Sequence, residues 1–193
     1  TGEIGDGGGS DTPQAQKLKL ESGFHPAFES KLPPRINASS ERVVWDNGEG
    51  TKIEGVLVKP HPDIAKPPYK LVVLPHGGPH HRDGLGAGFN DQILASKGYA
   101  IFKANFRGST GYGLAFLDAN RGDLGGGDMR DIMSGVDHLV AEGVADEDQL
   151  FVYGLSYGGF MTSWMVGQSN RFRAAVAENA PTDLTMMWAL SDL

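Results

Sequence analysis

The sequence contains no cysteine among its 193 residues. This absence excludes disulfide bonds, thiolate metal sites and a cysteine nucleophile. Long apolar runs are also lacking, since stretches such as "LVVL" at 71–74 are far too short to cross a bilayer. No basic region followed by an apolar one stands at the start, so no signal peptide is visible. We therefore expect a protein without disulfides, not bound to a membrane and located in the cytoplasm.

Positive charge is also scarce: the sequence has 17 Lys and Arg against 24 Asp and Glu, so its net charge is -7. Binding to nucleic acid requires a basic surface, so we expect no nucleic-acid partner. The adjacent His80 and His81 have no cysteine and no suitably spaced carboxylate nearby, which makes a poor zinc signature. We expect neither a metal nor another cofactor.

The chain divides into two regions by composition. Residues 1–40 are rich in glycine, proline and polar residues without periodicity, which predicts a flexible or linker-like lead-in. Residues 41–193 alternate between strand-like and helix-like segments. This alternation is typical of an α/β fold with a mostly parallel sheet and helices on both faces, in which sites form at the carboxyl ends of the strands.

Individual segments can be assigned within the second region. Expected strands are "RVVW" and "KIEGVLVKP" around an Asn-Gly turn, then "YKLVVL", "YAIFKAN", "DQLFVYG" and "FRAAVAE". Expected helices are "FNDQILASKG", "GDMRDIMSGVDHLVAEG" and "YGGFMTSWMVGQS". Asp128 is the predicted N-cap of the second helix, and Gly98 and Gly143 are the predicted ends of the first two.

The segment "GLSYG" at 154–158 fits the pattern G-x-S-x-G between a strand and a helix. A nucleophile on such a sharp turn requires small residues two positions before and after it, and Gly154 and Gly158 meet this need. The turn exposes the hydroxyl of Ser156. It also directs the backbone N–H of Tyr157 toward the place where an oxyanion would form.

A second oxyanion donor is expected from the loop "HGGP" at 76–79, which follows a strand. Gly78 is the first candidate, through its backbone N–H, and Gly77 the second. His76 in the same loop is expected to brace the loop rather than to act as a base.

Two further polar residues stand at strand ends. Arg107, in the glycine loop "NFRGSTGYG", could contact a substrate or brace the loops, and bracing is the favoured interpretation. Asp183 is the only acid placed where a catalytic triad could use it, although a capping role beside a proline explains it more simply.

Four motifs in this order carry a family resemblance: "LPHGGPH", "ANFRGSTGYG", "DIMSGVDHLV" and "GLSYGGFMTSW". Together they resemble the catalytic domain of the prolyl oligopeptidase family of serine peptidases, in the branch of acylaminoacyl-peptidases and dipeptidyl-aminopeptidases. The resemblance implies an α/β-hydrolase fold, a short peptide or acyl-peptide substrate, Ser156 as the nucleophile, and the amides of Tyr157 and Gly78 as the oxyanion hole.

The sequence departs from the family pattern in two ways. Residues 1–40 are too few for the family's β-propeller. The family's acid and histidine follow the serine, but only 37 residues follow Ser156 and none is histidine. We therefore expect a hydrolase fold truncated on its C-terminal side. Two alternatives remain: a minimal esterase with His76 or His80 as substitute base, and a non-catalytic fragment or binding module. An open sheet edge would favour self-association.

Overall fold

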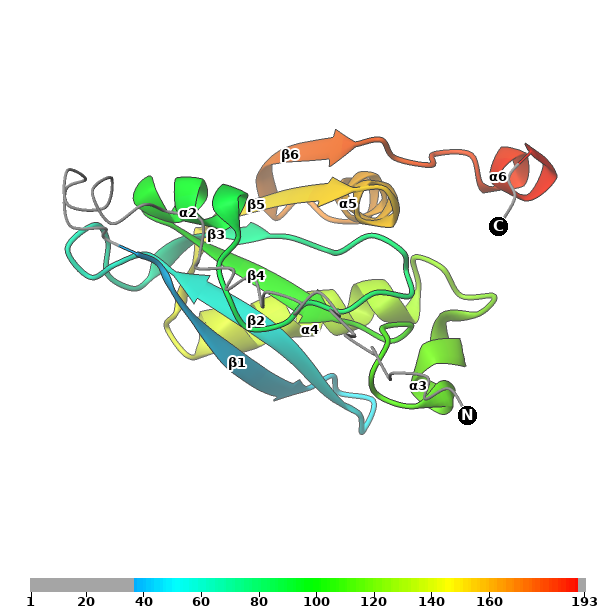
Figure 1. Cartoon of the computed structure of the whole chain (residues 1–193), viewed down its shortest axis with the longest axis horizontal. Helices are drawn as coiled ribbons and strands as arrows, with labels where there is room; N and C mark the ends of the chain where they lie inside the picture. Colours follow the sequence, from blue (N-terminus) through cyan, green and yellow to red (C-terminus); the bar gives the residue numbers. More distant parts are fainter. Residues whose placement is uncertain (1–36, 191–193) are drawn as a thin grey trace, which may run out of the picture. The chain divides into compact units, whose positions relative to one another are not determined.

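The computed structural model describes residues 37–190. Their central feature is a six-stranded sheet with the strand order β1-β2-β4-β3-β5-β6 (Figure 1). Residues 1–36 of the predicted lead-in lie outside the described residues. The predicted boundary at residue 40 stays a prediction. The strands are β1 (Ser39–Asp46), β2 (Lys52–Lys59), β3 (Tyr69–Val73), β4 (Tyr99–Asn105), β5 (Ala145–Leu155) and β6 (Phe172–Glu178).

The first two strands form the predicted antiparallel pair, with Asp46 opposite Lys52. Asn47 organises the turn between them, because its Oδ1 accepts hydrogen bonds from the N–H groups of Glu49 (2.9 Å) and Thr51 (3.1 Å). The Asn-Gly turn is thus confirmed, although the connection spans residues 47–51 rather than two residues.

The remaining strands make the sheet mixed but mostly parallel. β2 pairs with β4 antiparallel, whereas the neighbouring pairs β4–β3, β3–β5 and β5–β6 are all parallel. The carboxyl ends of these four parallel strands therefore meet at one edge of the sheet, where sites form in such folds.

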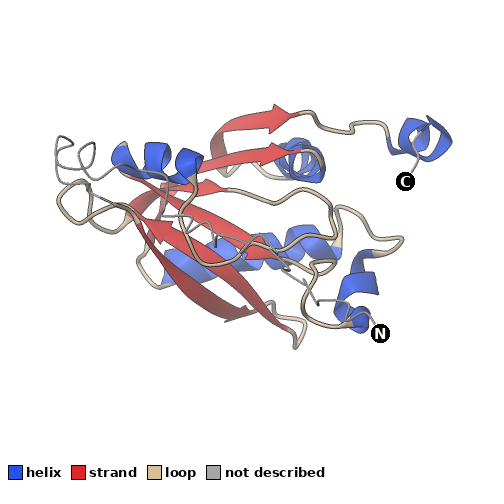
Figure 2. Cartoon of the chain, viewed as in Figure 1, coloured by secondary structure: helices blue, strands red, loops and turns tan. Residues whose placement is uncertain are grey.

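Helices fill the connections from β3 onward, as the alternating pattern predicts (Figure 2). A short helix and a 3₁₀ turn that follow β4 have no counterpart in the sequence prediction. No helix of the described residues combines the length and hydropathy needed to cross a membrane. The helices are α2 (Phe89–Ser96), α3 (Leu114–Leu117), η1 (Asp118–Asn120), α4 (Gly127–Ala141), α5 (Tyr157–Gln168) and α6 (Leu184–Leu190).

Two apolar layers lie on opposite faces of the sheet because side chains alternate along each strand. Phe102 of β4 belongs to the larger cluster, which α4 and α5 complete with residues such as Ile132 and Met161. Its neighbour Ile101 points the other way and packs against Ala95 of α2. Helices thus cover both faces, α4 and α5 on one and α2 on the other.

The helix ends test the capping predictions. Gly98 and Gly143 have positive φ angles of +83° and +69° just beyond α2 and α4, as predicted. The prediction for Asp128 is wrong: α4 begins at Gly127 with Gly126 as N-cap, so Asp128 lies inside the first turn. Its carboxylate has another partner, described below. Asp123 instead accepts the hydrogen bond of an early amide, that of Gly127, at 2.8 Å.

Candidate active site

The serine turn lies between the end of β5 at Leu155 and the start of α5 at Tyr157. Ser156 has φ 59° and ψ -122°, a backbone conformation that glycine adopts easily and other residues rarely. The turn is also tied to the neighbouring strand, because Ser156 N–H donates to Glu178 O at 2.9 Å. The backbone therefore holds a strained serine at the carboxyl end of the sheet.

Close backbone approaches explain the glycines of this turn. A Cβ atom at Gly154 would lie 2.1 Å from Gly158 O, and one at Gly158 would lie 2.1 Å from Pro75 O. Both contacts are with backbone atoms, which cannot move aside as a flexible side chain can. The steric argument made from the sequence thus holds at both positions.

The loop after β3 reaches the serine. A Cβ atom at Gly77 would lie 3.5 Å from Ser156 Cβ and 3.9 Å from Ser156 Oγ. Gly78 has φ +117°, which favours glycine. Within residues 37–190, neither the Gly78 amide nor the Tyr157 amide donates to a protein acceptor. The structure thus brings the nucleophile candidate next to the loop that carries the second donor candidate.

The side chain of His76, in the same loop, is buried, and both ring nitrogens contact groups other than Ser156. Its Nδ1 lies 2.8 Å from Gly77 O, its Nε2 lies 2.9 Å from Ser109 Oγ, and its ring stacks on Phe106 at 4.3 Å between centroids. Burial lowers the pKa of His76, which favours the neutral imidazole. These contacts are those of a bracing residue.

Arg107 is held by carboxylates on neighbouring elements. Its backbone N–H and Nε each donate to Asp131 Oδ2 at 2.9 Å, and its Nη2 donates to Asp131 Oδ1 and to Glu49 Oε2, both at 2.7 Å. The hydrogen bond that the Arg107 side chain donates to Asp131 is the largest cause that raises the pKa of Arg107. The geometry is that of a brace, and a substrate contact by Arg107 stays a prediction.

A family model for the prolyl oligopeptidase family matches residues 87–193, more than half of the chain. The chain belongs to the prolyl oligopeptidase family. The match includes the serine turn, α4, α5 and the glycine loop "NFRGSTGYG" at 105–113, here called the second glycine loop.

Curated relatives in this family are peptidases. The chain is 40% identical over 154 residues to the uncharacterized peptidase YuxL of Bacillus subtilis, which covers 79% of this chain and 23% of that protein. It is 45% identical over 98 residues to dipeptidyl aminopeptidase BIII of Pseudoxanthomonas mexicana, covering 51% of the chain and 14% of the relative. The chain thus spans less than a quarter of the length of each.

Solved structures agree on the fold. Acylaminoacyl peptidase of Pyrococcus horikoshii superposes with a TM-score of 0.76 at 29% identity, covering 86% of this chain and 26% of that one. An acylaminoacyl peptidase in complex with Z-Gly-Gly-Phe-chloromethyl ketone superposes with a TM-score of 0.75 at 31% identity, covering 86% and 27%. The predicted family and the α/β-hydrolase fold are both confirmed.

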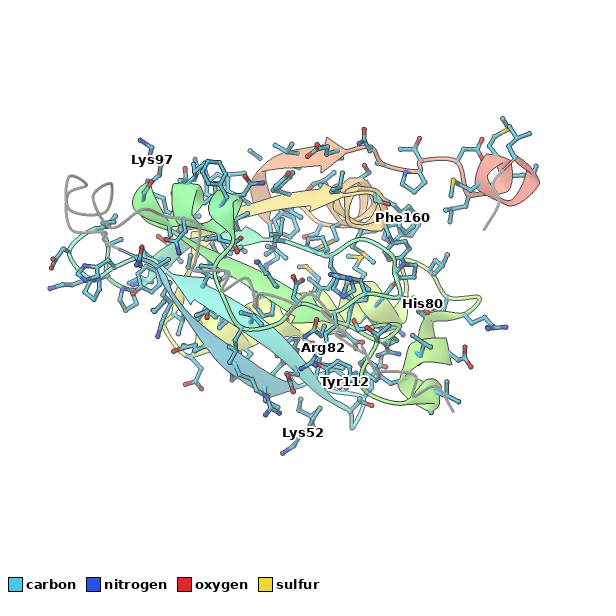
Figure 3. All side chains as sticks on the ribbon, in the orientation of Figure 1. Lys52, His80, Arg82, Lys97, Tyr112 and Phe160 are labelled. Atoms are coloured by element: carbon cyan, nitrogen blue, oxygen red, sulfur yellow. The ribbon has the colours of Figure 1, made fainter. Side chains whose placement is uncertain are left out.

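Other residues of interest have different surroundings. Asp183 caps α6, since its Oδ1 accepts from Met186 N–H at 2.9 Å. Tyr112 lies beside Arg82, whose guanidinium is 5.4 Å from the ring centroid (Figure 3). His80 and His81 are exposed, and within residues 37–190 no group of three potential metal-binding side chains is found.

The sequence did not reveal the contacts of two carboxylates: Asp128, predicted only as an N-cap, and Asp131, the first residue of the motif "DIMSGVDHLV". Asp131 anchors Arg107, and Asp128 accepts a hydrogen bond from the side chain of Tyr157. Both lie in the first turns of α4, more than 20 residues from their partners in the sequence. Their complete burial is the property that marks them, and no local pattern in the sequence reveals it.

Proposed function

We propose that this chain supplies the nucleophile and the oxyanion hole of a serine peptidase that hydrolyses short peptides. Ser156 Oγ attacks the carbonyl carbon of the scissile bond, a base passes the hydroxyl proton to the leaving nitrogen, and the amine leaves as the acyl-enzyme forms. The amides of Tyr157 and Gly78 stabilise the negative charge on the carbonyl oxygen. Water then attacks the acyl-enzyme and releases the acid.

The strained serine turn is the observation that carries this proposal. A non-glycine residue at φ 59° is costly, about 1–3 kcal/mol, and such strain concentrates at functional sites. Here it exposes a hydroxyl that has no hydrogen-bond partner among residues 37–190, beside a glycine loop with an unbonded amide. A purely structural turn needs neither the strain nor the neighbouring loop.

Serine attack also needs a base to accept the hydroxyl proton. None of the residues after Ser156 is histidine. His76 has both ring nitrogens within hydrogen-bond distance of other groups, which argues against it as a substitute. His80 is exposed and remains the candidate base for the alternative of a minimal esterase. We propose that Ser156 alone in this chain acts as a catalytic side chain.

The substrate proposal follows the relatives. The family comprises peptidases, among them acylaminoacyl peptidases, one of which is in complex with Z-Gly-Gly-Phe-chloromethyl ketone. That compound is a short peptide whose N-terminus is blocked. By this analogy we propose short peptides and acyl-peptides as substrates.

Labelling by a fluorophosphonate tests the proposal on the 193-residue chain. The serine oxygen displaces fluoride from phosphorus, and the phosphoryl oxygen occupies the oxyanion hole. Wild type and Ser156→Ala are compared with and without added imidazole, which supplies an external base. Circular dichroism establishes that both proteins are folded.

We expect labelling of wild type and none of Ser156→Ala. Labelling without imidazole would mean that the chain contains its own base, and His80→Ala would then test the esterase alternative. Labelling that requires imidazole would mean that the nucleophile and oxyanion hole are present without a base. A folded wild type that is not labelled even with imidazole would overturn the proposal and favour a binding module.

We also propose that the chain associates with a second copy through β6. Within residues 37–190 this strand pairs only with β5, and its residues from Arg173 to Glu178 are exposed. It borders a cavity of about 500 Å³ lined mainly by apolar side chains of α2, β5 and β6. The opposite edge, β1, carries charged residues in ion pairs such as Glu41–Lys59, which protect an edge from pairing.

Sedimentation velocity over a range of concentrations tests this association. We expect the mass of wild type to rise with concentration and that of Val176→Lys, with a charge on β6, to rise less. Val166→Lys on the exposed part of α5 is the matched control. A wild type that is monomeric at every concentration would overturn the self-association.

A further inference from the structure

The residue after the serine has a second set of contacts, made by its side chain. Tyr157 is buried, and its ring lies near Phe160 (5.2 Å between centroids) and Phe106 (6.2 Å). Its hydroxyl donates a short hydrogen bond to Asp128 Oδ2. The residue whose amide is the proposed oxyanion donor is thus attached at its far end to α4.

Asp128 is fully buried, with 0% of its surface exposed. Its Oδ1 accepts from Met129 N–H at 2.8 Å, while Oδ2 accepts from Tyr157. Burial is the largest cause that raises the pKa of Asp128, and it also raises the pKa of Tyr157. The tyrosine hydroxyl therefore keeps its proton at neutral pH and lies in position to donate to Asp128 Oδ2.

A second contact joins the same two helices. Trp164 Nε1 on α5 donates to Gly125 O at 2.6 Å, just before α4. A Cβ atom at Gly125 would lie 2.8 Å from Trp164 Nε1, so the indole packs directly on this backbone. Phe160, which lies between Tyr157 and Trp164 along α5, is labelled in Figure 3. The start of α4 thus holds α5 at two points, and the contact with Tyr157 is the one next to Ser156.

We propose that Asp128 is a positioning residue: through the Tyr157 hydroxyl it fixes the direction of the Tyr157 backbone N–H toward the oxyanion. The inference rests on the proposed function of Ser156. Its physical basis is that the ring and the amide belong to one residue next to a strained turn, so anchoring the ring limits rotation of the peptide group. A displacement of about 1 Å at a reacting centre can cost as much as 100-fold in rate.

Two conservative variants test the pair. Tyr157→Phe keeps the ring and removes only the hydroxyl, and Asp128→Leu keeps a similar side-chain size but removes both acceptor oxygens. The matched control is Tyr153→Phe, which removes another tyrosine–carboxylate hydrogen bond, the one from Tyr153 to Glu178 Oε2 at 2.7 Å. If one variant fails to fold, the other still carries the test.

The first measurement separates binding from bond formation in fluorophosphonate labelling. We expect both variants to lower the rate constant of bond formation by about 10- to 100-fold, with a nearly unchanged half-saturating concentration. The double variant should be no slower than the slower single variant, because both changes break one hydrogen bond. For Tyr153→Phe, the rate constant of bond formation should lie within about twofold of the wild-type value. The loss of an oxyanion-hole donor would lower it far more.

The second measurement does not depend on reactivity. The residual dipolar coupling of the Tyr157 amide reports the direction of its N–H bond, and we expect it to change in both variants but not in Tyr153→Phe. Slower labelling with an unchanged coupling would overturn the positioning role, and so would wild-type labelling in both variants. If wild type is not labelled at all, the proposed function fails, and the coupling alone decides whether Asp128 orients the amide.

Discussion

The loop after β4 and the turn after β5 lie at the same edge of the sheet but are built in opposite ways. The first is attached to α4 by the fully buried Asp131 carboxylate, which accepts hydrogen bonds from Arg107 and from Asn47 Nδ2 (2.8 Å). In the second, Ser156 holds a strained backbone, and its hydroxyl has no partner among residues 37–190.

The first arrangement stabilises the fold, whereas the second makes a hydroxyl available for reaction. A buried carboxylate with all its hydrogen bonds made stabilises the fold around it, and it has no capacity left to act on a ligand. An exposed hydroxyl on a strained turn contributes nothing to stability, but it is available to react. Replacing the buried Asp131 carboxylate and replacing the Ser156 hydroxyl should therefore have opposite effects on stability and reactivity.

The largest loss of stability is expected from Gly158→Ala, because the new Cβ would lie 2.1 Å from the backbone oxygen of Pro75. No side chain can move to relieve this contact, so we expect a loss of more than about 4 kcal/mol in the free energy of unfolding. Urea denaturation measures it. Gly167→Ala, on the same helix with open space around it, is the control and should gain up to about 1 kcal/mol. Similar stability of the two variants would contradict the backbone contact.

The next effect is expected from Asp131→Ala, which leaves Arg107 without its main partner. We expect a loss of about 3 kcal/mol, since removing one member of a buried pair leaves the other unsatisfied. Asp137→Ala is the control on the same helix, because its ion pair with Arg171 (2.6 Å) is mostly exposed. That variant should lose less than about 1 kcal/mol. Equal losses in urea denaturation would show that the Arg107 brace does not stabilise the fold.

Ser156→Gly should have the opposite sign. Glycine adopts φ 59° without strain, so we expect a gain of about 1–2 kcal/mol in stability together with complete loss of fluorophosphonate labelling. Ser156→Ala should also lose labelling, but it retains the Cβ atom and so gains less. If Ser156→Gly is less stable than wild type, the turn is not strained in the way its angles indicate.

The two regions also differ in how far the sequence predicts them. The serine turn was predictable because its motif is contiguous, from Gly154 to Gly158, although the backbone atom that Gly158 approaches belongs to Pro75. The sequence indicates the second glycine loop equally well, and bracing was the favoured interpretation of Arg107. It does not indicate the brace's partner, because Asp131 lies 24 residues further along the chain.

Asp128 shows the same limit more sharply. By residue type and position it matches a helix N-cap, but it lies two residues after the N-cap Gly126, inside the first turn of α4, and its carboxylate accepts a hydrogen bond from Tyr157. Contacts between α4 and α5 depend on how β5 brings the two helices together over one face of the sheet. Strand order and helix packing are properties of the whole fold, so the alternating pattern predicts the layers but not the side-chain pairs between them.

The smallest effect is expected in the pH dependence of stability, through His76. This residue contacts Ser109 in the loop after β4 and belongs to the loop beside Ser156. Burial lowers the pKa of this imidazole in the folded protein. Its contribution to stability is therefore fully present above the ordinary histidine pKa of about 6.5 and is lost as the pH falls through the lower folded value. The urea concentration at the midpoint of unfolding should decrease as the pH is lowered from about 7.5 to about 5. In His76→Asn this concentration should decrease less. An identical fall in both proteins would mean that His76 is not a neutral, buried brace, and would reopen its assignment as a base for Ser156.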